Sequence, residues 1–101
     1  MKVLKNILQE SEQYYRDIKR KLERQIRVLP RGGVKMRKIA GRSYYYHQYR
    51  DGEKVIHKYL GKERPEELIQ QIKKRKSSQE ELKKVKEALK IIQRSKGRKR
   101  G

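Results

Sequence analysis

The chain has 101 residues, of which 31 are lysine or arginine and 12 are aspartate or glutamate, so its formal net charge is +19. It contains no cysteine, phenylalanine or tryptophan, and only 33% of its residues are hydrophobic. This composition excludes a disulfide framework, a cysteine-based metal site and a large hydrophobic core, and it limits the chain to one domain.

The excess of positive charge makes nucleic acid the leading partner class, ahead of an anionic membrane and an acidic protein. No apolar run approaches the roughly 18 to 20 residues that span a bilayer. The N-terminal residues also lack the long apolar stretch and small-residue cleavage site of a signal peptide. We therefore expect a cytoplasmic, nucleoid-associated protein without a membrane partner.

The N-terminal part of the chain has the pattern of one long helix. Its apolar residues recur mostly three or four positions apart from Val3 to Leu29, which is the spacing of a helical stripe. The residue before Pro30 is steered out of the α region, and Gly32-Gly33 disfavours further helix. The sequence predicts a helix over about 3–29.

The middle of the chain has the pattern of a three-stranded antiparallel sheet over about 34–60. Three runs are rich in tyrosine, valine and isoleucine, and they are Val34 to Ala40, Ser43 to Arg50 and Glu53 to Leu60. Gly41-Arg42 and Asp51-Gly52 separate them. An Asp-Gly pair between such runs favours a type I′ hairpin turn, because both of its residues tolerate positive φ.

A second helix is expected over about 65–93. Pro65 suits a first helical position, and an apolar stripe runs from Leu68 to Ile92. Ser78 begins a capping-box pattern, so a break at Ser77-Ser78 is an alternative, but the stripe keeps its phase there and favours one helix. The basic tail, 94–101, has no apolar residue and is expected to be flexible.

The expected fold class is therefore α+β, with helix, three-stranded meander and helix forming a single domain over 1–93. Both stripes have about the width of a coiled-coil seam, so an antiparallel helical pair with the sheet at its closed end buries them economically. An alternative is that the stripes meet those of a second copy or another protein.

Two-residue turns at Gly41-Arg42 and Asp51-Gly52 would place Tyr46 opposite both Arg37 and His57. Since directly paired residues share a face and neighbours alternate, the residues separate into two sets. One face is mainly apolar and suited to cover by a helix. It carries Val34, Met36, Ala40, Tyr45, Tyr49, Ile56 and Leu60, with His47, Lys38, Lys54 and Lys58 among them. The other face is basic and rich in tyrosine, and it carries Lys35, Arg37, Tyr44, Tyr46, Gln48, Arg50, His57 and Tyr59.

The basic face has the chemistry of a nucleic-acid platform. Cationic groups neutralise phosphates, tyrosine rings stack on bases, and arginine and glutamine side chains hydrogen-bond to base edges. A structural role is the alternative, since tyrosine favours strands and a polar face keeps a small sheet from aggregating. The expected binding residues are those of the basic face together with Arg42 in the first turn and Arg98, Lys99 and Arg100 in the tail.

The segment from Gly41 to Gly61, with the pattern Gly-x-x-Tyr-Tyr-Tyr-x-x-Tyr-Arg-Asp-Gly-x-Lys-Val-x-x-Lys-Tyr-Leu-Gly, resembles a hairpin of small prokaryotic and mobile-element proteins. In those proteins a Leu-Pro-x-Gly segment also precedes the sheet, as Leu29 to Gly32 does here. The order of strands and helix also resembles the arm-binding domain of tyrosine recombinases, whose sheet enters a DNA groove. This second resemblance implies that Arg37, Tyr44, Tyr46, Gln48 and Arg50 would face the groove.

Catalysis has little support in the sequence. The chain has two histidines, His47 and His57, and the expected register places them on opposite faces, where they form neither a metal pair nor a nucleophile and base. We therefore expect a non-enzymatic DNA-binding protein without a cofactor, such as an accessory factor of a mobile element or a toxin-antitoxin locus. The alternatives are a coiled-coil adaptor protein and a protein that binds structured RNA.

Overall fold

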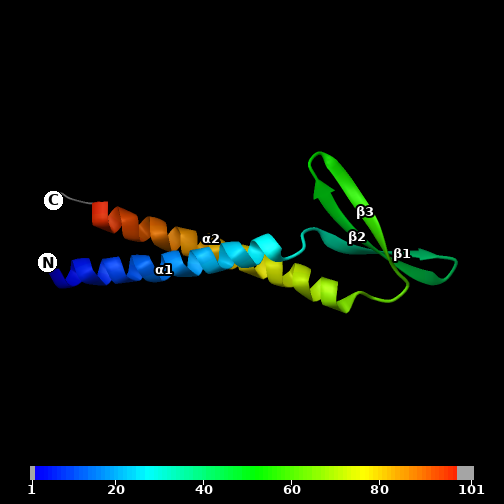
Figure 1. The fold of residues 1–101 in the computed structure, drawn as a ribbon, viewed down its shortest axis with the longest axis horizontal. Coiled ribbons are helices and arrows are strands. Elements are labelled where there is room, and N and C mark those ends of the chain that lie inside the picture. Colours follow the sequence, from blue (N-terminus) through cyan, green and yellow to red (C-terminus); the bar gives the residue numbers. More distant parts are fainter. Residues whose placement is uncertain (1, 98–101) are drawn as a thin grey trace. The chain divides into compact units, whose positions relative to one another are not determined.

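The computed structural model describes residues 2–97, which form two helices and one sheet (Figure 1). This α+β order of helix, three strands and helix is the one that the sequence predicts. In chain order the elements are α1 (Lys2–Val28), β1 (Gly33–Ile39), β2 (Arg42–Asp51), β3 (Lys54–Gly61) and α2 (Glu66–Gly97). They belong to two compact units, one made of α1 and the part of α2 from Ser77 onward, and one made of residues 29–76.

The helical unit is an antiparallel pair with a small apolar core (Figure 1). Leu22 of α1 and Val85 and Leu89 of α2 are buried together. Tyr15, Ile18 and Leu82 pack against them and remain partly exposed. The predicted pairing of the two apolar stripes within one chain is therefore confirmed.

Helix α2 continues without interruption through Ser78. The Ser78 side chain is buried, and its Oγ donates a hydrogen bond of 3.3 Å to Oε1 of Gln25 in α1. Ser78 therefore connects the two helices and does not cap a new one. α2 also includes Arg94 to Gly97, which the sequence had assigned to the flexible tail, whereas 98–101 lie outside the described residues.

An ion pair joins the two helices near the end of α2. Lys96 Nζ donates a hydrogen bond of 2.6 Å to Oε1 of Glu12, and Arg16 Nε donates one of 3.0 Å to its Oε2. The Glu12 side chain is only 12% exposed. The hydrogen bond from Lys96, followed by that from Arg16, lowers the pKa of the Glu12 carboxyl. Neither helix is long and apolar enough to cross a membrane over the residues that the structure describes.

The sheet has the strand order β1-β2-β3 with antiparallel neighbours. Its first turn is Ala40-Gly41, where φ is 52° and 80°, as in a type I′ turn. Its second turn is Gly52-Glu53, with φ of 63° at Gly52, as at the first central position of a type II′ turn.

Both turns differ from the predicted positions by one residue, so the predicted cross-strand pairs between each turn and the irregularity at Tyr45 and Tyr46 are wrong by two residues. Tyr46 lies opposite Lys35 and Tyr59, where Arg37 and His57 were expected. Because side chains alternate with a period of two, this even shift leaves the eight residues of the basic face on the face expected for them. The register of β2 and β3 also shifts between Tyr45 and Tyr46.

The apolar face of the sheet lies against the first turns of α2, within the unit formed by residues 29–76. Ile69 and Ile72 line a common hollow with Val34, Met36 and Tyr45. Ile72 is only 5% exposed. A helix therefore lies against part of this face, while Met36 and Ala40 remain exposed.

Gly32 occupies a position that no other residue fits without strain. Its φ is +88°, and a Cβ atom built there would lie 2.0 Å from the carbonyl oxygen of Gln48. The obstacle is the backbone of β2, which is paired on both sides. The chain can therefore pass this close to β2 only with glycine at this position.

We expect Gly32→Ala to lower the free energy of unfolding by about 2–4 kcal/mol, because it adds left-handed backbone strain to a clash with Gln48. Denaturant unfolding measures the change. Gly33→Ala is the matched control, since Gly33 has no positive φ and a Cβ atom there meets nothing within 4 Å. Equal loss in both variants would contradict this account.

The Glu12 ion pair predicts a pH dependence of the helical unit. Because the folded-state pKa of Glu12 lies below its ordinary value of 4.5, its stabilising contribution is present above that value and is lost as the pH falls through the lowered pKa. Glu12→Gln should reduce the melting temperature at pH 7 and have much less effect at pH 2. Glu87→Gln, at an exposed position of α2, is the control that should change neither value appreciably.

Candidate nucleic-acid interface

Strand β2 is the central strand, so its alternating side chains form the middle of both sheet faces. On one face the register brings together the eight basic and tyrosine-rich residues predicted from the sequence. We name this surface the tyrosine face, and it comprises Lys35, Arg37, Tyr44, Tyr46, Gln48, Arg50, His57 and Tyr59. Arg42 begins β2 and shares this face, while Arg98, Lys99 and Arg100 lie outside the described residues.

Three tyrosine rings form a cluster on the tyrosine face. The ring centroid of Tyr59 lies 5.5 Å from that of Tyr46 and 6.3 Å from that of Tyr44. The Arg37 guanidinium lies 5.5 Å from the centroid of the Tyr46 ring, within the range of a cation–π contact. Tyr59 remains 52% exposed. The cluster therefore places the Arg37 guanidinium, in contact with Tyr46, close to the solvent-exposed ring of Tyr59.

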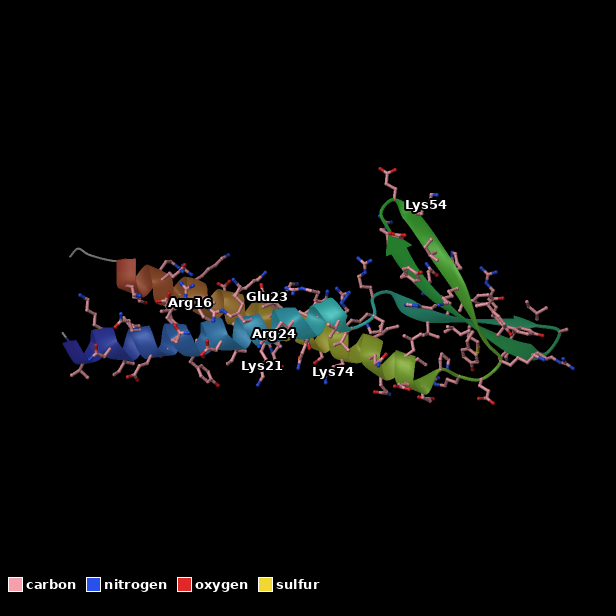
Figure 2. All side chains as sticks on the ribbon, viewed as in Figure 1. Arg16, Lys21, Glu23, Arg24, Lys54 and Lys74 are labelled. Carbon is pink, nitrogen blue, oxygen red and sulfur yellow. The ribbon has the colours of Figure 1, made fainter. Side chains whose placement is uncertain are left out.

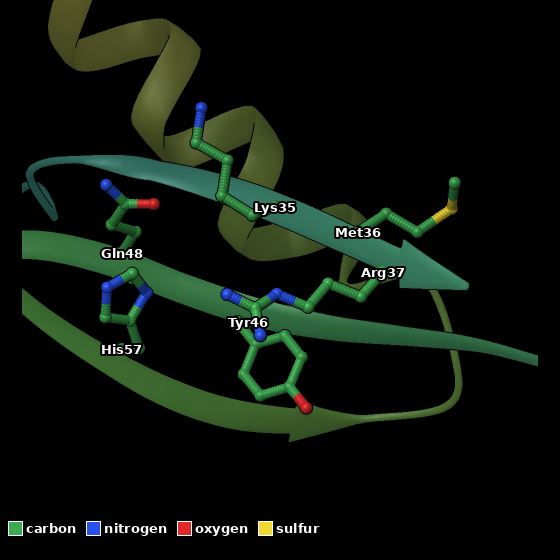
Figure 3. Close-up of a pocket in the computed structure, with 6 residues that line it drawn as sticks. All are labelled: Lys35, Met36, Arg37, Tyr46, Gln48 and His57. Carbon is green, nitrogen blue, oxygen red and sulfur yellow. The ribbon is translucent and has the colours of Figure 1, made fainter. Parts of the chain in front are cut away.

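A hollow of about 540 Å³ lies beside this cluster, and Lys35, Arg37, Tyr46, Gln48 and His57 line it together with Met36. In Figure 3 the side chains of Gln48 and His57 lie side by side, and Arg37 extends along the sheet over Tyr46. Gln48 and His57 are direct cross-strand partners. Hydrogen-bonding groups from all three strands therefore surround one depression.

Met36 was not predicted at this site, because alternation places it on the opposite face. It reaches the margin of the hollow from β1, which is an edge strand. Its side chain is 52% exposed. At the edge of a sheet, a long unbranched side chain can bend around the strand and contact either face. The edge position of β1 is the one feature of the sequence prediction that could have indicated this contact of Met36.

The tyrosine face is positively charged without local compensation. None of the strand residues that share it is acidic. Lys35, Arg37, Arg42 and Arg50 form no ion pair within residues 2–97, whereas Arg16 and Lys96 in the helices are paired with Glu12. The positive potential of this face is therefore available to a polyanion.

The two histidines lie on opposite faces, as predicted. His47 Nε2 is 2.7 Å from the carbonyl oxygen of Arg31, and its ring centroid lies 4.7 Å from that of Tyr49. His57 lines the hollow of the tyrosine face. Over residues 2–97, no group of three or more acidic, histidine or cysteine side chains is placed to hold a metal ion.

A family model described as a domain of unknown function, DUF6788, matches residues 6–70, which include the whole sheet. No curated protein and no solved structure matches the chain. The resemblances to mobile-element hairpins and to recombinase arm-binding domains remain predictions.

Proposed function

The chain belongs to the DUF6788 family, and we propose that it is a non-enzymatic protein that binds duplex DNA through the tyrosine face. The observation that carries this proposal is the placement of the Arg37 guanidinium 5.5 Å from the centroid of the Tyr46 ring, beside the Gln48 and His57 pair. Phosphate neutralisation, stacking and base-edge hydrogen bonding are thereby available on one surface.

The positive charge of the chain supports a polyanion as its binding partner. The chain has a net charge of +19, and the tyrosine face concentrates Lys35, Arg37, Arg42 and Arg50 without an acidic neighbour on the same face. Each cation that replaces a counterion at a phosphate strengthens binding at low salt. The affinity should therefore depend steeply on salt concentration.

Groove geometry supports duplex DNA over duplex RNA. The DNA major groove, about 12 Å wide, admits a β-ribbon, whereas side chains do not reach base edges in the deep, narrow major groove of RNA. Arginine pairs with guanine and glutamine with adenine in that groove, which gives Arg37 and Gln48 specific roles. The resemblance to the recombinase arm-binding domain supports the same geometry.

In this proposal the protein is cytoplasmic and nucleoid-associated, and an accessory role in a mobile element or a toxin-antitoxin locus is its biological setting. Binding to structured RNA is an alternative outcome, since the exposed Tyr59 ring could stack on an unpaired base. An adaptor function of the helical unit is the remaining alternative.

The decisive experiment compares binding to duplex DNA, single-stranded DNA and an RNA hairpin across a salt series. We expect the wild type to prefer duplex DNA, and we expect Arg37→Ala/Tyr46→Ala/Arg50→Ala to bind it about 100-fold or more weakly, because each lost contact costs about 1–3 kcal/mol. Loss of Arg50, taken as a phosphate contact, should also reduce the slope of log affinity against log salt by about 1, whereas loss of the base-reading Arg37 should relax sequence preference.

Two controls separate the tyrosine face from net charge. Lys54→Ala/Lys58→Ala removes two exposed cations that the register places on the opposite face, and it should weaken binding far less than Arg37→Ala/Arg50→Ala. Tyr46→Phe keeps the ring and should bind nearly as the wild type does. Equal losses in the two double variants would contradict a binding site on the tyrosine face, and preference for the RNA hairpin would favour structured RNA.

A further inference from the structure

Helix α1 has a second face, separate from the stripe that packs against α2, and large apolar side chains on it are exposed to solvent. Val3 is 70% exposed, Tyr14 is 62% exposed and Val28 is 80% exposed, and Ile7 is also exposed. The steps from Val3 to Ile7 and from Ile7 to Tyr14 are four and seven residues, which is heptad spacing. We name this surface the outer face of α1.

The same heptad line contains four charged residues in an ordered arrangement. If this line is continued along α1 in alternating steps of four and three residues, it passes through positions 3, 7, 10, 14, 17, 21, 24 and 28. Glu10 and Asp17 lie in its first half, and Lys21 and Arg24, labelled in Figure 2, lie in its second half. Glu10, Lys21 and Arg24 make no ion pair with another residue of the described chain, whereas Asp17 is 3.8 Å from Arg20.

In a reversed copy this order places one carboxylate opposite one cation, whereas Asp17 would lie opposite Tyr14 and Arg24 opposite Ile7. In an antiparallel pair of α1 helices, Glu10 would lie opposite Lys21 of the second copy, and Val3 would lie opposite Val28 of the second copy. In a parallel pair each charged residue would lie opposite the same residue of the second copy, so like charges would face each other. Opposite charges across a helix pair select the partner and its orientation.

We propose that the outer face of α1 is a self-association surface on which two copies of the chain pair in antiparallel orientation. The contact buries Val3, Ile7, Tyr14 and Val28 of each copy and joins Glu10 of one to Lys21 of the other twice, by two-fold symmetry. A contact of one helix pair is small, so the dimer forms and dissociates with protein concentration. The inference does not depend on what the tyrosine face binds.

Single-cysteine variants test the orientation directly, because the chain has no cysteine of its own. Val3→Cys and Val28→Cys are oxidised separately and as a mixture. The antiparallel pair brings these two positions within the roughly 4.4–6.8 Å between Cα atoms that a disulfide requires. It separates two copies of the same position by about 37 Å, from 1.5 Å per residue over the intervening helix. We expect a crosslinked dimer in the mixture alone.

Sedimentation velocity of charge variants tests how strongly the Glu10 and Lys21 pair contributes to self-association. The protein is first freed of nucleic acid, so that a bound polyanion does not bridge two copies. Glu10→Lys and Lys21→Glu should each weaken self-association about tenfold, since each places two pairs of like charges together. The double variant restores opposite charges and should recover the wild-type association. Glu53→Lys, in the second turn of the sheet, is the control of equal charge change.

Several results would overturn the proposal. Crosslinking of Val3→Cys with itself would indicate a parallel pair, and a wild-type chain that stays monomeric at all concentrations would exclude self-association. Failure of the double charge variant to recover would contradict the pairing of Glu10 with Lys21. Failure of DNA binding would contradict the proposed function alone, because these measurements contain no nucleic acid.

Discussion

The alternation of side chains along β2 is the constraint on which the sheet depends. Because β2 has a partner on each side, only its two faces are open to other contacts. Tyr45 and Tyr49 belong to the face that the first turns of α2 approach, whereas Tyr44 and Tyr46 belong to the tyrosine face. A chain without phenylalanine or tryptophan thus uses tyrosine for packing on one face and for an exposed aromatic cluster on the other. This division explains why five tyrosines lie so close together in the sequence.

The membership of each sheet face was predictable from the sequence, whereas the cross-strand partners were not. Gly41 can be either the first or the second residue of a two-residue turn. In the structure it is the second, and Ala40 is the first with a φ of 52°. A positive φ is uncommon for a residue with a Cβ atom. Gly52 likewise permits either a type I′ or a type II′ turn. Each error displaced the pairing by two residues, which preserves the alternation. The ring contact between Tyr46 and Tyr59, which depends on the pairing itself, could not be predicted.

Periodicity predicted the helices but not their contacts. The phase of the α2 stripe across Ser78 correctly indicated one helix, while the hydrogen bond from Ser78 to Gln25 requires knowledge of how the two helices are aligned. The same alignment brings Glu12 to Lys96, 84 residues later in the chain. The stripe predicted for α1 from the sequence includes Leu22 but neither Val3 nor Val28. In the structure Leu22 is buried against α2 while Val3 and Val28 are exposed, so the helix has two apolar faces.

The distribution of carboxylates gives the two exposed surfaces different electrostatic character. The tyrosine face has no acidic strand residue, so its charge favours a polyanion as the proposed partner over a second copy of itself. The outer face of α1 carries Glu10 and Asp17 as well as Lys21 and Arg24, so two copies can approach there with opposite charges in register. Pairing through α1 would give one particle two tyrosine faces. A second face that binds the same polyanion acts at a high effective concentration, which strengthens overall binding without any additional contact within either face.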